Sequence, residues 1–279
     1  MPVMTVSPLK ASERLKNLSD TPMYVKALIY GDPGSGKTFL ACTAKNPFLI
    51  LSEWAVAKPT LERLRRDRGI DPDTWFVNSW DDFMEAYKYV SANISKYDTI
   101  VVDGVTDLND RAVTEILSSS INAANRKTAH DPDQLEIGDW GKVLNRTLYA
   151  VRLFRDLPCD VVMTALAQEI KNEMFTAPMV SPKTAQKKLP AHFNLVGYLV
   201  AEPRPGKPSL RKLHLDATIT YHAKNPGGAL PATIEDPDFS IIVPQIREFL
   251  SQGQTEDIKV TVSAPAQVRP LTTQMNSKK

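Results

Sequence analysis

The eight residues GDPGSGKT, Gly31–Thr38, decide the fold of this chain. They fit the pattern G-x-x-x-x-G-K-[ST], which is typical of a P-loop. An apolar run, Tyr24–Tyr30, comes before the motif, and a helix-forming run, Phe39–Lys45, follows it. The motif therefore lies where a P-loop has to lie, between a buried strand and the amino terminus of a helix.

Each residue type in the motif has a task in holding a nucleotide. Gly31, Gly34 and Gly36 let the backbone turn tightly and point its N–H groups at phosphate oxygens. We expect the Lys37 ammonium to reach the β- and γ-phosphates and the Thr38 hydroxyl to bind Mg²⁺, so the predicted ligands are ATP and Mg²⁺. The predicted nucleotide-binding residues are Gly31, Asp32, Pro33, Gly34, Ser35, Gly36, Lys37, Thr38 and Phe39.

Composition limits the class of protein. The 279-residue chain is long enough to bury a full α/β core. Its 34 basic and 32 acidic residues give a formal charge of +2, so any basic surface has to be local. Cys42 and Cys159 both stand in apolar runs, which predicts reduced core residues. No apolar run approaches the ~18 residues of a membrane span, and the amino terminus lacks a signal peptide, so we expect a soluble, cytoplasmic protein without a membrane partner.

Short apolar segments alternate with amphipathic segments through most of the chain. The predicted strands are Tyr24–Tyr30, Phe48–Ser52, Thr74–Asn78, Thr99–Asp103 and Asp160–Ala167. The predicted helices are Lys37–Lys45, Thr60–Arg68, Asp81–Lys96, Asp107–Ser119 and Ile137–Leu157. This alternation predicts an α/β fold with a doubly wound, mainly parallel sheet.

The pattern changes after Ala167. Residues 168–192 contain three prolines and no clear period, which predicts a long loop. Two further strands, Leu195–Ala201 and Arg211–His222, are expected to form an antiparallel hairpin joined by the turn EPRPGKPS. A last helix, Phe239–Ser251, is expected to close the ordered part.

These elements predict one folded core between two extensions. The core covers residues 23–252 and carries all the predicted strands and helices. Residues 1–22 are polar and rich in proline, which predicts a flexible arm. Residues 253–279 are polar and without periodicity, which predicts a flexible tail.

Three polar residues stand at the ends of predicted strands, where nucleotide chemistry needs them. Asp103 ends the strand TIVVD and can hold the Mg²⁺ shell in the Walker B role, with a helix N-cap as the alternative. Glu53 follows the strand FLILS and can polarise the attacking water, or it is a solvated loop acid. Gln168 follows the strand CDVVMTALA and can contact the γ-phosphate, or it is only a polar strand end. The predicted catalytic residues are Lys37, Glu53, Asp103 and Gln168, and the predicted metal ligands are Thr38 and Asp103.

The order of these parts resembles the ATPase core of RecA/RadA-type recombinases over residues 22–225. In that family a catalytic Glu follows the second strand, an apolar strand ending in an acid supplies Walker B, and a strand ending near a Gln leads into DNA-binding loops. Glu53, Asp103 and Gln168 stand at these three places. The minimal form is most similar to phage-encoded RecA-core single-strand annealing proteins of the Sak group, which also have Ser-Glu after the second strand.

The resemblance implies further features of the protein. In a RecA-type sheet the strand after the P-loop helix neighbours the P-loop strand. A homo-oligomer, either a ring or a filament, is implied, in which Lys224 of the segment AKNPGG reaches the nucleotide of a neighbour. An ordinary surface lysine is the alternative for Lys224. The implied partners are single-stranded DNA and a single-strand-binding protein, in the host-cell cytoplasm if the chain is phage-encoded.

Local basic charge indicates where DNA is expected to bind. Residues 169–224 contain nine basic and four acidic residues, a net +5 in a chain of +2. Lys183, Lys187 and Lys188 are the predicted phosphate contacts, although a solvated basic loop has the same composition. Phe175 is the candidate for base stacking. The run RLRRDR, Arg63–Arg68, is predicted to be a solvated helix face.

These patterns favour a DNA-stimulated ATP hydrolase that binds single-stranded DNA and anneals strands in phage-type homologous recombination. The alternative is an AAA-type motor or loader ATPase that acts on a protein partner or on duplex DNA. It should carry an arginine finger and a helical lid after the core. A small-molecule kinase and a switch that binds ATP without turnover also stay open, because every one of these classes uses a P-loop.

Overall fold

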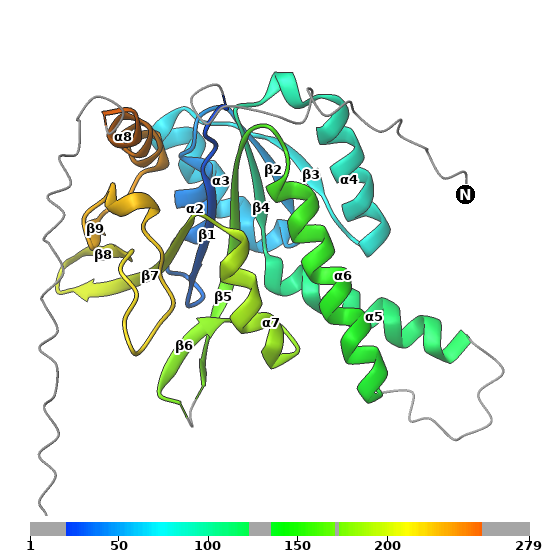
Figure 1. The fold of residues 1–279 in the computed structure, drawn as a ribbon. Helices are drawn as coiled ribbons and strands as arrows, with labels where there is room; N and C mark the ends of the chain where they lie inside the picture. The colour runs from blue at the N-terminus through cyan, green and yellow to red at the C-terminus, as the bar shows by residue number, and fades with distance from the viewer. Residues whose placement is uncertain (1–20, 123–134, 171–172, 253–279) are drawn as a thin grey trace, which may run out of the picture.

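A sheet of nine strands forms the centre of the structure, a computed structural model that describes residues 21–122, 135–170 and 173–252 (Figure 1). The strand order is β3-β2-β4-β5-β1-β7-β8-β9, and β6 pairs with β5 outside this path. The strands are β1 Lys26–Gly31, β2 Pro47–Leu51, β3 Asp73–Phe76, β4 Thr99–Asp103, β5 Asp160–Ile170, β6 Phe175–Pro178, β7 Leu195–Arg204, β8 Lys207–His214 and β9 Thr233–Glu235. Pairing is parallel from β3 to β7 and antiparallel for β6, β8 and β9, so the predicted fold class is confirmed.

Helices cover both faces of the sheet. They are α2 Lys37–Cys42, α3 Trp54–Arg68, α4 Trp80–Ala92, α5 Val105–Asn122, α6 Ile137–Arg155, α7 Lys183–Lys188 and α8 Phe239–Gln252, with short 3₁₀ turns at Ile94–Lys96, Leu189–His192 and Pro226–Gly228. Leu28 and Tyr30 of β1 pack with α4, α5 and α6, whereas Ala27 and Ile29 pack with α2, α3 and α8. Burial on both faces explains why the parallel strands are continuous apolar runs in the sequence.

The structure also bears on the two cysteines and on the character of the helices. Cys42 and Cys159 are buried and free, which confirms the prediction of reduced core cysteines. None of the helices in the described residues combines the length and apolar character that a membrane crossing requires. The predicted tail and nearly all of the predicted arm lie outside the described residues.

The strand order differs from the one that the RecA resemblance implies. β2 pairs with β3 and β4, and β5 and β4 both lie between β2 and the P-loop strand β1. The expected pairing of β2 with β1 is therefore wrong. A helix about 10 Å across covers about two strand spacings, so a strand–helix–strand crossover leaves room for strands that come later in the chain.

The predicted loop over residues 168–192 is also wrong. β5 continues to Ile170 and pairs antiparallel with β6, and α7 and a 3₁₀ turn follow. The three prolines that suggested a loop mark the boundaries of these short elements: Pro178 ends β6, Pro182 caps α7, and Pro190 lies in the first turn of the 3₁₀ segment. Proline is compatible with such positions because it lacks an N–H that they do not need.

The carboxyl-terminal hairpin exists with tighter limits than expected. β7 runs to Arg204 and pairs there with Lys207 of β8, so only two residues form the turn. Gly206 in that turn has a φ of 68°, a conformation that glycine adopts without strain. β8 ends at His214 rather than His222, and a third antiparallel strand, β9, follows.

The helix α3 begins earlier in the chain than predicted. α3 begins at Trp54 instead of Thr60 and contains Pro59. The predicted helix began at Thr60, directly after this proline. In the structure α3 starts directly after Glu53, at the carboxyl end of β2.

Candidate nucleotide-binding site

A cavity of about 450 Å³ opens at the carboxyl ends of the parallel strands. Ligands of open α/β sheets bind at this edge, where the strands lead into loops and helix amino termini. It is lined by the P-loop, α2, α3, α5, the ends of β2 and β4, the middle of β5 and one residue of β8. The structure brings eight of the predicted site residues together in the lining, which also includes Arg211: Pro33, Gly34, Gly36, Lys37, Thr38, Phe39, Glu53 and Asp103. Its volume is in the range of small-molecule and cofactor sites.

The Lys37 side chain is hydrogen-bonded to the backbone of the P-loop. Gly36, with a φ of 99°, precedes α2, and the Lys37 Nζ donates hydrogen bonds to the carbonyl oxygens of Gly31 at 3.0 Å and Asp32 at 2.9 Å. Burial lowers the pKa of the Lys37 ammonium, and nearby carboxylates, Asp103 first, oppose that effect. The ammonium is thus held within the phosphate-binding turn by weak backbone acceptors that a phosphate can replace.

The Asp103 carboxylate lies between two hydroxyl groups. Thr38 Oγ1 donates to Asp103 Oδ2 at 2.8 Å, and Thr164 Oγ1 donates to Asp103 Oδ1 at 2.6 Å. The Thr164 hydroxyl in turn accepts a hydrogen bond from the Gly104 N–H at 3.0 Å. Burial raises the pKa of the Asp103 carboxyl, while these hydroxyl donors and the Lys37 charge oppose the rise.

This pair of oxygen ligands fits Mg²⁺. The ion prefers hard oxygen ligands and uses one or two protein groups together with phosphate oxygens and water. Thr38 and Asp103 supply a hydroxyl and a carboxylate within one hydrogen bond of each other. The described residues contain no cluster of three or more His, Cys, Asp and Glu side chains that could hold a metal.

Glu53 stands at the rim of the cavity. It precedes the first residue of α3, its carbonyl accepts the hydrogen bond of the Ala57 N–H at 3.0 Å, and its side chain is exposed. The preceding residue, Ser52, is fixed from α5 because Arg111 Nη2 donates to its carbonyl at 3.5 Å. Arg111 Nε is held by Asp107 at 2.7 Å. The backbone that carries Glu53 is therefore supported from two helices.

Gln168 lies outside the cavity lining. It opposes Ala177 in the β5–β6 pair, and its Oε1 accepts a hydrogen bond from Gln186 Nε2 of α7 at 3.2 Å. Leu166, two residues earlier on β5, does line the cavity. The structure therefore places Gln168 on the connection from the cavity to α7 rather than at the site itself.

The predicted DNA contacts lie on a helix instead of a loop. Lys183, Lys187 and Lys188 are all exposed on α7, and Lys187 Nζ is 3.9 Å from a carboxylate oxygen of Glu173. The Phe175 ring packs edge-on against a histidine ring and is half-buried.

The Lys224 side chain contacts the backbone near the amino end of β7. Its Nζ donates to the carbonyl of Phe193 at 2.9 Å, just before the amino end of β7. β7 runs parallel to β1, whose carboxyl end leads into the P-loop, so Lys224 lies away from the nucleotide site of its own chain.

Three residues at the site escaped the sequence reading. Thr164 was hidden in the apolar strand β5, where one polar residue was the only available signal. Arg63, assigned to a solvated face, lines the cavity with its guanidinium 5.1 Å from the centroid of the Phe39 ring. Arg211, counted only as part of the basic excess, lies against the P-loop.

Comparison with known protein families adds a finding independent of this geometry. The family model described as AAA domain (AAA_24) matches residues 23–226. The matched range includes the P-loop, Glu53, Asp103, Thr164 and Arg211, and therefore every wall of the cavity. Comparison with curated proteins gives no match.

Proposed function

We propose, from the premise that this chain belongs to the AAA domain family of P-loop ATPases, that it hydrolyses ATP and couples the reaction to binding of single-stranded DNA. Family membership implies the ATPase activity, and ATP with Mg²⁺ is what the family generally uses. The DNA part, including annealing of strands in phage-type recombination and contact with a single-strand-binding protein, is our proposal.

The observation that carries the coupling is the course of β5. Thr164 of this strand binds the Asp103 carboxylate at 2.6 Å, and Ala165 and Leu166 line the cavity. Gln168, four residues beyond Thr164, is hydrogen-bonded to α7, the helix with three exposed lysines. One strand therefore touches both the predicted Mg²⁺ ligand and the predicted DNA-binding helix.

The residues of the cavity have distinct roles in this proposal. Thr38 and Asp103 would hold Mg²⁺, which would supply positive charge to offset that of the phosphates. Lys37 leaves its backbone acceptors and pairs with the β- and γ-phosphates. In this proposal Glu53 would accept a proton from the attacking water. A shift of Asp103 would move Thr164 and, through β5, the Gln168–Gln186 contact.

The test is steady-state ATP hydrolysis with single-stranded DNA, with duplex DNA and without DNA. We expect single strands alone to stimulate turnover. Replacing both Lys187 and Lys188 by alanine should weaken DNA binding and reduce the slope of log K against log salt by about 1.4, because each of the two lost phosphate contacts contributes about 0.7 on a single strand. Lys88→Ala, which removes an exposed lysine of α4, is the matched control and should keep the full stimulation.

A different result would favour the second candidate, an AAA-type motor or loader that acts on a protein partner or on duplex DNA. The structure offers that candidate an apolar surface at the sheet edge. Trp54 and Phe76 are 43% and 40% exposed, and their ring centroids are 4.4 Å apart beside the edge strand β3. Stimulation by duplex DNA alone would reject the single-strand proposal in favour of this candidate. No stimulation by either DNA would also reject it, and would favour an ATPase that acts on a protein partner, a kinase or a switch. We also propose that copies of this chain assemble into a ring or filament.

A further inference from the structure

Arg211 reaches the P-loop from β8, the second strand of the carboxyl-terminal hairpin. Its Nε donates a hydrogen bond to the carbonyl oxygen of Ser35 at 3.1 Å. Asp236, the residue after β9, fixes the backbone of Arg211. The Arg211 carbonyl accepts a hydrogen bond from the Asp236 N–H at 2.7 Å, and the Arg211 N–H donates to Asp236 Oδ1 at 3.3 Å. The guanidinium is therefore presented to the P-loop from an anchored strand.

The last glycine of the P-loop accommodates this side chain. A Cβ on Gly36 would lie 2.3 Å from Arg211 Nε, closer than any real contact. Gly34, by contrast, has no atom within 4 Å of the place where its Cβ would be. The Arg211 guanidinium thus packs directly on the residue that precedes Lys37, within the turn whose N–H groups are directed at phosphates.

Most hydrogen-bond donors of this guanidinium have no protein partner. Arginine carries five N–H donors, and only Nε is engaged, by Ser35. Within residues 21–122, 135–170 and 173–252, neither Nη group forms a hydrogen bond or an ion pair, and the residue lines the cavity. A half-buried cation with a free fork of donors beside Lys37 has the chemistry that binds phosphate oxygens.

We infer that Arg211 is a nucleotide ligand supplied in cis, whose Nη groups bind the phosphate chain while Nε holds the P-loop to β8. This inference rests on the nucleotide-binding part of the proposed function and not on its DNA part. Nucleotide binding would then also affect the β7–β8 hairpin, because Arg211 belongs to β8.

Two substitutions separate a phosphate contact from a purely structural tether. Arg211→Lys keeps the positive charge, whereas Arg211→Gln keeps a donor for the Ser35 carbonyl but removes the charge. The equilibrium affinity of the full chain for fluorescent ADP and ATP analogues is measured with Mg²⁺ and without DNA. We expect Arg211→Gln to weaken binding about tenfold or more, since a charge-assisted hydrogen bond is lost, and Arg211→Lys to recover part of the loss.

Lys212→Gln serves as the matched control. Lys212 is the next residue on β8, its Nζ contacts Glu202 at 2.8 Å, and its side chain lies on the opposite face of the strand. Its substitution should leave nucleotide affinity unchanged. Wild-type affinity in Arg211→Gln, or equal losses in the Lys and Gln variants, would overturn the inference. Failure of DNA to stimulate turnover would remove the proposed DNA function and leave this result intact.

Discussion

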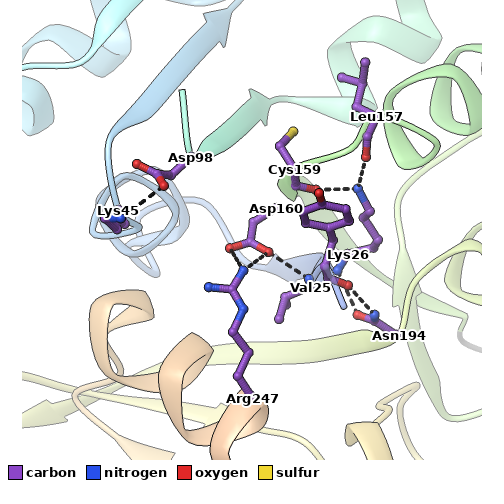
Figure 2. A network of polar contacts seen from close by, with 10 residues as sticks. Val25, Lys26, Lys45, Asp98, Leu157, Cys159, Asp160, Asn194 and Arg247 are labelled. Atoms are coloured by element: carbon purple, nitrogen blue, oxygen red, sulfur yellow. Dashed lines mark hydrogen bonds and ion pairs between the residues drawn. The ribbon is translucent and has the colours of Figure 1, made fainter. Parts of the chain in front are cut away.

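The two edges of the sheet both hold charged groups beside a cavity, yet they differ in what those groups contact. The amino edge has the larger cavity, about 710 Å³ against about 450 Å³ at the carboxyl edge. Figure 2 shows the polar network at the amino edge, where Arg247 of α8 points at Asp160. Asp160 Oδ1 accepts from the Val25 N–H at 2.9 Å and both its oxygens accept from Arg247 Nη2 at 2.7 and 2.8 Å.

The neighbouring groups of the amino edge are satisfied in the same way. Lys26 Nζ donates to the carbonyl of Leu157 at 2.6 Å, and the Asn194 side chain binds both the Lys26 N–H at 2.8 Å and the Tyr24 carbonyl at 2.9 Å. These contacts fasten the start of β1 to β5 and β7. At the carboxyl edge, in contrast, Asp103 and Arg211 hold α2 and the P-loop, through Thr38 Oγ1 and the Ser35 carbonyl. What the charged groups hold in place, strand ends at one edge and the phosphate-binding turn at the other, therefore separates the two edges better than cavity size does.

Among substitutions that test this difference between the two edges, we expect Lys37→Ala at the carboxyl edge to have the largest effect. Loss of the ammonium removes the charge that pairs with the β- and γ-phosphates, so turnover should fall by about a hundredfold or more. Steady-state ATP hydrolysis measures the effect, and thermal unfolding without nucleotide shows whether the fold is kept. Turnover at the wild-type rate would refute the assignment of the carboxyl edge as the nucleotide site.

A second effect at the same edge is expected from glycine substitutions. Gly36→Ala places a methyl group 2.3 Å from Arg211 Nε, so the guanidinium has to leave the P-loop and nucleotide affinity should fall about tenfold. Gly34→Ala shares the positive φ, 78° against 99°, but meets no neighbouring atom, and is the matched control for backbone strain.

Combining the variants tests whether both changes act through one contact. The double variant Gly36→Ala, Arg211→Gln should bind nucleotide no more weakly than the worse single variant, because both remove the same interaction. Losses that multiply instead would show that Gly36 matters through backbone conformation alone. Equal losses in the Gly34 and Gly36 single variants would lead to the same conclusion.

The sequence alone was sufficient to predict those site residues that belong to one contiguous motif. The P-loop and the apolar strand ending in Asp103 are contiguous patterns, and the structure places Thr38 and Asp103 2.8 Å apart. Thr164 and Arg211 could not be found in that way, since each meets the site through strand register: Asp103 pairs with Thr164 across β4 and β5. The order of the strands likewise depends on crossovers that no local pattern records.

A third prediction concerns the amino edge and should change stability without changing nucleotide binding. Asp160→Ala leaves the buried Val25 N–H without its acceptor and Arg247 without its partner, so the free energy of unfolding should fall by about 2 kcal/mol. For a chain of this size that corresponds to a melting temperature lower by about 5 °C. Asp160→Asn keeps an acceptor for the Val25 N–H and should lose less. A tenfold loss of ATP affinity in either variant would contradict the structural role of this edge.

The smallest effect is expected from Lys45→Ala, at the rim of the same edge. Lys45 Nζ lies 3.1 Å from Asp98, but the two side chains are 79% and 45% exposed, so solvent and salt screen the pair (Figure 2). The free energy of unfolding should change by less than about 0.5 kcal/mol, well below the change in Asp160→Ala. Urea denaturation of both variants at the same ionic strength measures the difference. A loss as large as that of Asp160→Ala would mean that the amino-edge charges act as one coupled network, and then burial of Asp160 would no longer explain why that residue matters.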